Sequence, residues 1–488
     1  MSDVDLVPAG RPPTAPAGTP GPAPAPSGRT AVRRRAVAVC AAAGLVLSAV
    51  LGPFVDAPTL WGLVPIVLYA VLALLGMDIM VATVVAIVSA LLIVHPSPSA
   101  TADMLGASLA DQVTMIGLII MLGAGVGEVL RATGVAATIV RGVMRVVGER
   151  NRTAVTLGVM LSCLLLVASL GTLAGALAIA APLLLPIVAR LGFTRSATAA
   201  MMFIGGCAGL ALAPFAGSNV AIMDAADVGY LTYLIHGAGP LAVLSVVAGL
   251  LIVPWMQRRT EGTGDLHDEE ITGDSEDAVP DGRSRRATAV FALVLVASVV
   301  YAVMAEAGTA FPLLALPVMG VAAALAGGMT PTEAARTVYR GAARLVDVFL
   351  LFWLLAALFK VVDDLAPFQV VLDTWGDDLG GMPPFLFALV IGLLGWVGVP
   401  GATAAQVVLL DQVFGGLAAD VGVGAGAWVI VLLFASKADT YGPFPNANMV
   451  GAMGLARSDR LNNMMLTGFL VLVPACLMYA AILFGETV

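Results

Sequence analysis

Two charged side chains, Lys437 and Asp439, stand where a long apolar stretch runs into the proline-rich segment KADTYGPFPNAN (437–448). Ionisable groups within such stretches are rare in membrane proteins and commonly mark the path of a substrate or an ion. An ammonium group can hold a carboxylate, and a carboxylate can hold a cation or a proton. The pair therefore predicts that Lys437 contacts an organic anion and that Asp439 contacts a coupling cation. An internal ion pair that only stabilises the segment is the alternative.

Four segments rich in glycine and proline interrupt apolar stretches, two in each half of the chain. We call SLGTLAGA (169–176) and GVPGATAA (398–405) the hairpin tips, and PFAGSN (214–219) and PFPNAN (443–448) the proline loops. Backbone broken at membrane depth must be buried in protein or line a cavity. Helix ends freed there attract ions of the opposite sign. We therefore predict that the four segments meet at one central binding site.

Hydroxyl, amide and backbone groups in these segments suit a small oxygen-rich anion or a coordinating cation. The residues that we predict to bind substrate or cation are Ser169, Gly171, Thr172, Gly175, Pro214, Gly217, Ser218, Asn219, Gly401, Thr403, Lys437, Asp439, Thr440, Pro443, Asn446 and Asn448. Asp439 and Asn448 would hold Na⁺. The coupling ion is expected to be H⁺ or Na⁺, and no cofactor is expected. Close helix packing over small residues is the alternative explanation.

Further ionisable residues lie in or beside apolar stretches. Glu128 and Asp411 are candidate proton carriers, or else lie at a membrane interface. Asp224 and Asp227 follow the first proline loop, where capping of the next helix is their expected role. His236 is a lone histidine on an apolar helix and a weaker candidate for a proton relay.

Composition restricts the class of protein. Of the 488 residues, 59% are apolar and 11% charged, and the mean hydropathy is +0.98. A soluble chain carries about 25% charged residues, so a soluble enzyme is excluded. The net charge is −8 and no basic stripe is long enough to follow a nucleic acid. No catalytic spacing or phosphate-binding loop occurs, so we predict a protein that is not an enzyme.

The hydropathy pattern divides the chain into five parts. We predict a disordered cytoplasmic tail (1–35), an extra first transmembrane helix (36–58), a first repeat (59–257), an acidic cytoplasmic linker (258–287) and a second, inverted repeat (288–488). The arginines that precede the first apolar run would also suit a signal peptide. The topology below favours the transmembrane helix.

The repeat rests on four matches in the same order. The hairpin tips and proline loops recur, PSPSATADMLGASLADQV (96–113) parallels MTPTEAARTVYRGAARLVDV (329–348), and both parallels precede an apolar helix that ends in acid. We predict an all-α polytopic fold in which each repeat has five transmembrane helices plus one re-entrant hairpin, about 11 spans and 2 hairpins in all. Arginines then gather on the side that holds the N-terminus, which predicts a bacterial cytoplasmic membrane protein with a cytoplasmic N-terminus.

The chain resembles the ion transporter superfamily of secondary carriers, and is most similar to its gluconate:proton symporter family. The resemblance lies in residues 122–151, 212–240 and 382–406 and extends over most of 60–484. The second proline loop looks more like that of NhaC-type Na⁺/H⁺ antiporters, and the Pro-Phe pair of the first loop is similar to that of anaerobic C4-dicarboxylate carriers. The resemblance implies inverted repeats, paired hairpins, broken helices and a homodimer in membrane lipid.

The residues and the resemblance together predict a secondary active transporter that works by alternating access. The expected activity is H⁺- or Na⁺-coupled symport of a small organic anion, such as a sugar acid, a hydroxycarboxylate or a dicarboxylate. A Na⁺/H⁺ antiporter without an organic substrate is the first alternative. A membrane sensor or scaffold that does not transport is the second, and the retained polar residues of all four breaks argue against it.

Overall fold

A computed structural model describes residues 28–148, 150–267, 281–305, 307–397, 403–442 and 445–487. Apart from one isolated bridge between Thr194 and Leu266, the regular elements in these ranges are all helical, which confirms the predicted all-α fold. Nine helical segments of the described chain are long and apolar enough to cross a membrane. The count of 11 spans and 2 hairpins stays a prediction.

The first series of helices precedes the linker. Its elements are α1 (Gly28–Leu51), α2 (Val64–Leu74), α3 (Ile79–Val94), α4 (Pro98–Ser108), α5 (Gln112–Ala132), α6 (Val135–Val147), α7 (Arg152–Leu170), α8 (Leu173–Arg190), α9 (Arg195–Leu212), α10 (Gly217–Ala225), α11 (Tyr230–Tyr233), the π-helical turn η3 (Leu234–Ala238) and α12 (Gly239–Thr260). Short 3₁₀ turns η1 (Gly52–Phe54) and η2 (Leu60–Leu63) lie between α1 and α2.

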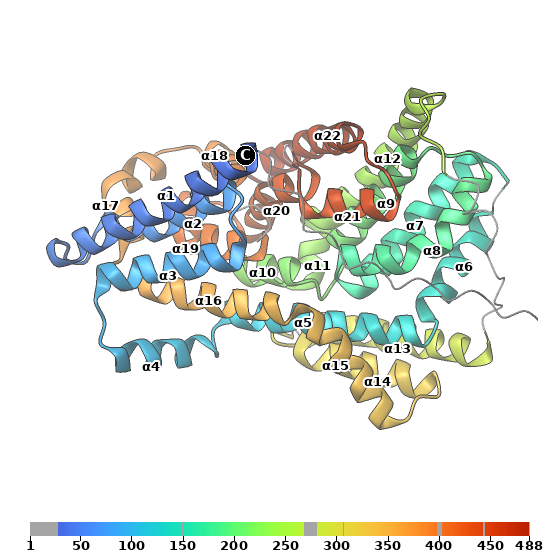
Figure 1. Cartoon of the computed structure of the whole chain (residues 1–488), viewed down its shortest axis with the longest axis horizontal. Coiled ribbons are helices and arrows are strands. Elements are labelled where there is room, and N and C mark those ends of the chain that lie inside the picture. Colours follow the sequence, from blue (N-terminus) through green and yellow to red (C-terminus); the bar gives the residue numbers. More distant parts are fainter. Residues whose placement is uncertain are drawn as a thin grey trace, which may run out of the picture.

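The second series follows the linker. Its elements are α13 (Gly282–Met304), α14 (Pro312–Ala326), α15 (Pro331–Ala342), the 3₁₀ turn η5 (Ala343–Leu345), α16 (Val346–Asp363), α17 (Pro367–Gly380), α18 (Pro384–Leu394), the 3₁₀ turn η6 (Gly395–Val397), α19 (Thr403–Val421), α20 (Ala425–Tyr441), α21 (Ala447–Leu455) and α22 (Leu461–Thr487). In Figure 1 the two series interleave, with α5 and α16 side by side.

The packing of the second series matches that of the first. In each, one arm of the hairpin packs on the broken helix (α7 on α9, α18 on α20), and the broken helix packs on the last long helix (α9 on α12, α20 on α22). The contacts between the series are reciprocal as well, because α10 packs on α19 while α21 packs on α8, and α3 packs on α16 while α14 packs on α5. The repeat itself stays a prediction. The opposite orientation of the two halves in a membrane stays a prediction.

The first helix is part of the bundle. α1 packs on α2 and α3, and Ser48 hydrogen-bonds the buried Ser89 of α3 at 2.7 Å. The helix begins at Gly28, earlier than the apolar run alone suggested, so it includes arginines that we assigned to a tail ending at residue 35. The remainder of that tail, 1–27, lies outside the described residues.

One residue near the start of the linker is buried, whereas residues 261–264 are exposed. Asp265 is only 3% exposed, its backbone oxygen accepts from the Arg195 amide at 2.7 Å, and its Oδ2 accepts from the Ser196 amide at 3.1 Å. Arg460, which precedes α22, lies 3.6 Å from Asp265 Oδ1 and donates to Thr263. The first linker residues therefore cap α9 and join it to α22. Residues 268–280 lie outside the described chain.

The crossing of α5 and α15 also connects the two series. A side chain at Gly341 would collide with the backbone of α5, so glycine permits the close approach. Beside it, the buried Glu128 is paired with Arg131 and lies 2.9 Å from Arg344. Two guanidinium groups held on one carboxylate indicate a structural junction, not the proton carrier that we considered.

Candidate functional site

The first hairpin tip meets the first proline loop. Gly171 ends α7 with φ +68°, a left-handed conformation that favours glycine. A Cβ at this position would lie 3.4 Å from the backbone of Ala216 and 3.5 Å from the carbonyl oxygen of Phe215. The two breaks of the first half are therefore in contact, as the sequence predicts.

Both of these breaks rest on the middle of α5. A Cβ at Gly217 would collide with Ile120, and a Cβ at Gly123 would lie 3.5 Å from the carbonyl oxygen of Leu170. Small residues on each side thus let the tip and the loop sit close to the α5 backbone. The first hairpin tip and the first proline loop therefore both pack directly on α5.

The freed carbonyl groups at the end of α9 are satisfied by side chains. Asn219, which is 4% exposed, donates its Nδ2 to the oxygens of Leu210 (2.8 Å), Ala211 (3.2 Å) and Ala213 (2.8 Å). The hydroxyl of Tyr233 also donates to Ala211, and that of Tyr230 donates to the Leu212 oxygen at 2.6 Å. These carbonyls are engaged, so the first proline loop does not offer them to a cation.

The second break has a different set of bonds. Asn446 caps α21 by accepting from the Met449 amide at 2.9 Å, and its Nδ2 donates to the Thr440 oxygen at 3.2 Å. The Thr440 hydroxyl donates to Ser436 within the helix. Tyr441, at the end of α20, is fully buried and its hydroxyl lies 2.9 Å from that of Ser245 in α12. A helix of the first series thus holds the end of α20.

Lys437 lies inside the bundle, on the last turns of α20. It is 5% exposed, and the thiols of Cys207 in α9 and Cys476 in α22 are within electrostatic range of its ammonium group. Burying an ammonium among apolar helices carries a large desolvation cost, so its retention calls for an explanation beyond packing. Two residues further on, the side chain of Asp439 lies outside the described structure, as do the whole of Gly401 and Pro443.

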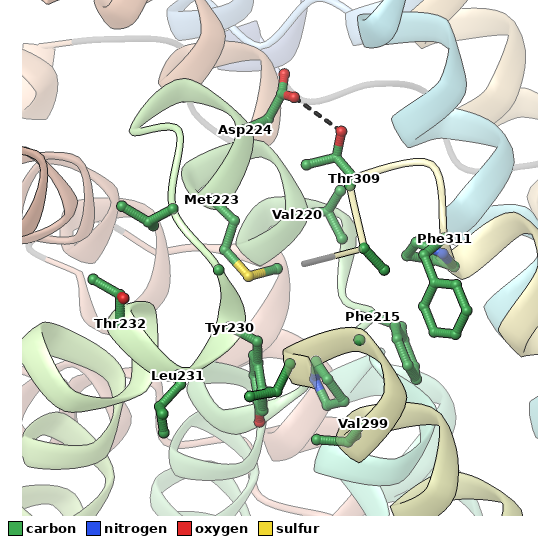
Figure 2. A pocket seen from close by; sticks show the side chains of 18 of the residues that line it. Phe215, Val220, Met223, Asp224, Tyr230, Leu231, Thr232, Val299, Thr309 and Phe311 are labelled. Atoms are coloured by element: carbon green, nitrogen blue, oxygen red, sulfur yellow. Dashed lines mark hydrogen bonds between the residues drawn. The ribbon is translucent and has the colours of Figure 1, made fainter. Parts of the chain in front are cut away.

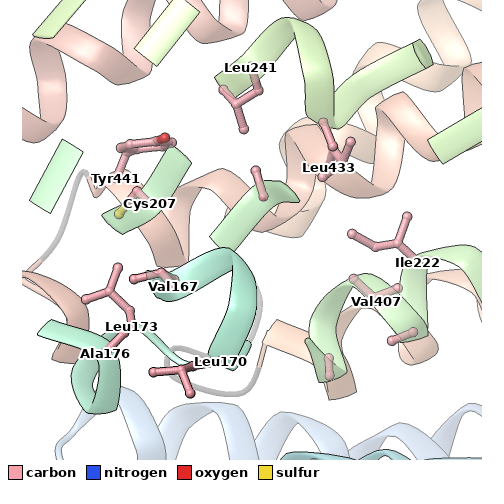
Figure 3. Packing of buried hydrophobic residues seen from close by; sticks show 14 of the residues in the cluster. Val167, Leu170, Leu173, Ala176, Cys207, Ile222, Leu241, Val407, Leu433 and Tyr441 are labelled. Atoms are coloured by element: carbon pink, nitrogen blue, oxygen red, sulfur yellow. The ribbon is translucent and has the colours of Figure 1, made fainter. Parts of the chain in front are cut away.

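The core between the breaks is apolar and joins the halves. Figure 3 shows Ile222 of α10 beside Val407 of α19, and Cys207 of α9 beside Tyr441 of α20. Thr403 stands at the first turn of α19 and is half-buried. Helices of both series therefore contribute side chains to the region where the sequence predicts the site.

The remaining residues that we predicted to bind substrate or cation lie in several different surroundings. Ser169 donates its hydroxyl to the Leu165 oxygen within α7, and Gly175 is exposed on α8. Thr172 is the N-cap residue of α8 but makes no capping bond. Ser218 lies 3.4 Å from Asn219 Oδ1, and Asn448 is half-buried in the first turn of α21. Pro214 lines a cavity described below.

Sequence reasoning missed the three tyrosines and Ser245. Tyr230, Tyr233 and Tyr441 lie beside the breaks, and their hydroxyl groups need partners when buried. That requirement was the available signal, since a tyrosine placed in an apolar stretch near a helix break has freed carbonyls within reach. Ser245 gave no such signal, because its partner is far away in the sequence.

The other ionisable candidates have structural partners. Asp224 does not cap the next helix: it lies in the last turn of α10, and its Oδ1 accepts from Gln112 at 3.0 Å and from Thr309 at 2.9 Å. Asp411 accepts from the Trp428 indole at 2.8 Å. His236, in the π-helical turn, lies 2.9 Å from the Thr232 oxygen and 3.6 Å from Glu486.

Comparison with known proteins identifies a family model described as the Na⁺/H⁺ antiporter family, which matches residues 38–255. The match covers less than half of the chain and is confined to the first series of helices. A search of curated proteins gave no match.

Two solved transporters have the same fold. The YdaH transporter of Alcanivorax borkumensis, described as having an unusual topology, aligns with a TM-score of 0.55 at 15% identity and covers 93% of this chain and 99% of its own. MtrF of Neisseria gonorrhoeae, described as illuminating a class of antimetabolite efflux pumps, aligns with a TM-score of 0.57 at 12% identity over 89% of this chain and 97% of its own.

These findings support a multi-pass membrane transporter, in agreement with the prediction that the chain is not an enzyme. They do not support the assignment to the gluconate:proton symporter family, because the matching family model is another one. The substrate, the coupling ion, the homodimer and the side of the membrane that holds the N-terminus stay predictions.

Proposed function

We propose that the protein is a secondary active transporter that couples H⁺ or Na⁺ to the symport of a small organic anion, with Lys437 as the partner of the substrate carboxylate. The observation that carries this proposal is the burial of Lys437, 5% exposed, at the break of α20. An ammonium group at that depth is the attractive element that an anion needs in order to leave water.

The hydrogen bonds of the first break leave few oxygen atoms for Na⁺. Asn219 turns the donor end of its amide toward the α9 carbonyls, and the Tyr230 and Tyr233 hydroxyls take up the others. Na⁺ binding requires free oxygen ligands, which these carbonyls no longer supply. The carboxylate of a substrate can share or replace the interaction that Lys437 makes in this state.

Na⁺/H⁺ antiport without an organic substrate is the second candidate, and the family match over residues 38–255 favours it. In that case Lys437 would lose its proton when Na⁺ binds nearby, because the two positive charges repel each other at short range. Asp439 and Asn448 would then supply oxygen ligands.

Transport by purified protein in sealed liposomes containing a pH-sensitive dye separates the two candidates. Organic anions are added with and without Na⁺, and Na⁺ is added alone. Proton or Na⁺ movement that requires one of the anions supports symport. Proton movement driven by Na⁺ alone supports antiport and removes the anion site.

Three lysine variants locate the ionisable centre. Lys437→Met keeps the length of the side chain without its charge and is expected to reduce uptake at least about 100-fold, the scale of losing a buried charged hydrogen bond. Lys437→Arg should retain part of the activity. Lys360→Met changes the other lysine of the chain, which is on α16 and lies 3.5 Å from Asp111. It should leave uptake near the wild-type rate. Unchanged uptake by a folded Lys437→Met protein would refute the proposed role.

A further inference from the structure

A cavity of about 660 Å³ lies apart from Lys437, between α10, α11 and the facing ends of α13 and α14. Figure 2 shows its walls: Phe215, Met223 and Tyr230 on the side of the first proline loop, and Val299 and Phe311 on the side of α13 and α14. Sites for small organic molecules commonly measure about 300–1,000 Å³. The cavity is therefore large enough for an organic ligand.

The aromatic side chains present ring surface to this space. The rings of Phe215 and Phe311 lie 6.4 Å apart, centroid to centroid, and are inclined by 56°. The hydroxyl of Tyr230 is bonded to Leu212, so its ring is the part that remains for a ligand. Aromatic faces carry partial negative charge and attract cations.

The charged side chains among the described lining residues of the cavity are acidic. Two carboxylates, Asp224 and Asp227, line it, and no lysine, arginine or histidine is found among its described lining residues. Thr309 and Gln112 both donate to the same oxygen of Asp224, Oδ1, so Oδ2 takes no part in these bonds. Carboxylates beside aromatic faces disfavour an anion and favour a cation.

We propose that this cavity is a binding site for an organic cation with an aromatic or branched aliphatic body, such as a quaternary ammonium compound. The charged end lies at Asp224 and Asp227, and the apolar body lies against the contacting pair of rings of Phe215 and Phe311. The site is separate from the anion site assigned to Lys437, since its charge is opposite and it lies on the other proline loop.

Occupation of the cavity has a consequence for transport. Its walls belong to α10 and α11 on one side and to α13 and α14 on the other, and Asp224 joins the two sides through Thr309. A ligand that contacts both sides stabilises this arrangement relative to any in which they separate. Occupation by the cation therefore favours the state in which α10 and α11 contact the ends of α13 and α14.

Equilibrium binding of radiolabelled benzyltrimethylammonium to the purified full-length protein tests the proposal. We expect saturable binding that neopentylbenzene, the uncharged analogue of the same shape, does not displace. Asp224→Asn retains an oxygen for Thr309 but removes the charge, and should weaken binding about tenfold, the scale of a partly desolvated ion pair and cation–π contact. Phe311→Ala should weaken it as well.

Asp103→Asn, an exposed carboxylate on α4, is the matched control and should bind like the wild type. Gel filtration establishes that each variant is folded, and Asp227→Asn replaces Asp224→Asn if the latter is not. Absence of saturable binding, equal displacement by neopentylbenzene, or wild-type binding by both the carboxylate and the Phe311→Ala variants would overturn the proposal. Because binding is measured without transport, these outcomes are independent of the substrate.

Discussion

The two proline loops break their helices at corresponding places, yet the broken ends are held differently. After α9, four successive carbonyl groups (210–213) accept hydrogen bonds from the side chains of Asn219, Tyr230 and Tyr233. After α20, the Asn446 amide donates to the Thr440 oxygen, and the same side chain caps α21. The first break is thus neutral and closely bonded.

The broken helices also differ in charge, because a buried lysine is present in α20 and not at the aligned position of α9. When the helix ends at Ala213 and Gly442 are aligned, Lys437 of α20 falls opposite Ala208 of α9, and both positions are buried. The helix starts differ too, because Thr194 caps α9 with its side chain while Gly424, at the start of α20, makes no such bond. We infer that the first break serves as an anchor and that the buried charge inside a broken helix belongs to the second half.

The largest expected effect comes from giving the first break the charge of the second. Ala208→Lys places an ammonium at a position that is 0% exposed. It should destabilise the protein by about 3 kcal/mol more than Ala208→Met, which adds similar bulk without charge. Melting midpoints and the yield of monodisperse protein in detergent measure the difference. Equal losses for both variants would mean that the first break tolerates charge, and the comparison would fail.

Loss of the Asn219 amide should have the next largest effect. Asn219→Ala removes three buried hydrogen bonds, each worth about 1 kcal/mol, and should cost about 2–3 kcal/mol. The Leu210 and Ala213 oxygens keep bonds from backbone amides, and the Ala211 oxygen keeps Tyr233. Asn448→Ala, at the aligned position of α21, should cost less than about 1 kcal/mol because Asn448 is half-buried. Unfolding in denaturing detergent compares them. A larger loss for Asn448→Ala would reverse the proposed roles.

The positions of the breaks could be predicted from the sequence, because glycine and proline act on the local backbone. Gly171 adopts the left-handed conformation at the predicted tip, and Asn446 stands at the predicted second loop. Hydropathy gave the all-α membrane fold for the same reason, since it depends on the composition of each segment alone.

The bonds that distinguish the two breaks could not be predicted, because they join residues distant in the chain. Asp224 finds Gln112 and Thr309, and Asp265 finds the start of α9, only after the helices pack. The sequence repeat also aligns Asn219 with Asn448, whereas the residue that bonds the broken end of α20 is Asn446. Aligning the two repeats therefore located the loop, but not the residue whose side chain bonds the broken end of α20.

The cap at the second break should contribute less than the amide at the first. Asn446→Ala loses the helix cap and the bond to Thr440, and should cost about 1–2 kcal/mol. Asn446→Ser keeps a capping oxygen but removes the donor to Thr440, so it should recover about half of this loss. Unfolding in denaturing detergent measures the loss of stability of these two variants and of Asn219→Ala, and so ranks the three. A cost for Asn446→Ala above that of Asn219→Ala would contradict the anchor role of the first break.

The smallest effect concerns the end of α12, where Glu261 follows the helix and joins it to the start of α7. Its Oε1 accepts from Gln257 at 3.1 Å and from Arg152 at 2.7 Å, and these bonds lower the pKa of the Glu261 carboxyl below its usual value. A carboxyl whose pKa is lower in the folded than in the unfolded state stabilises the fold above the unfolded value, and this contribution is lost as the pH falls through the folded pKa.

The difference in melting midpoint between wild type and Glu261→Gln should therefore be fully present at about pH 7 and should shrink as the pH drops below about 4. It should be small, because the side chain is exposed and water screens the pair. Asp103→Asn, an exposed carboxylate on α4, controls for the loss of one negative charge. A difference that persists unchanged in acid would mean that Glu261 acts by packing alone, and that charge contributes nothing to the anchoring of the first half at this point.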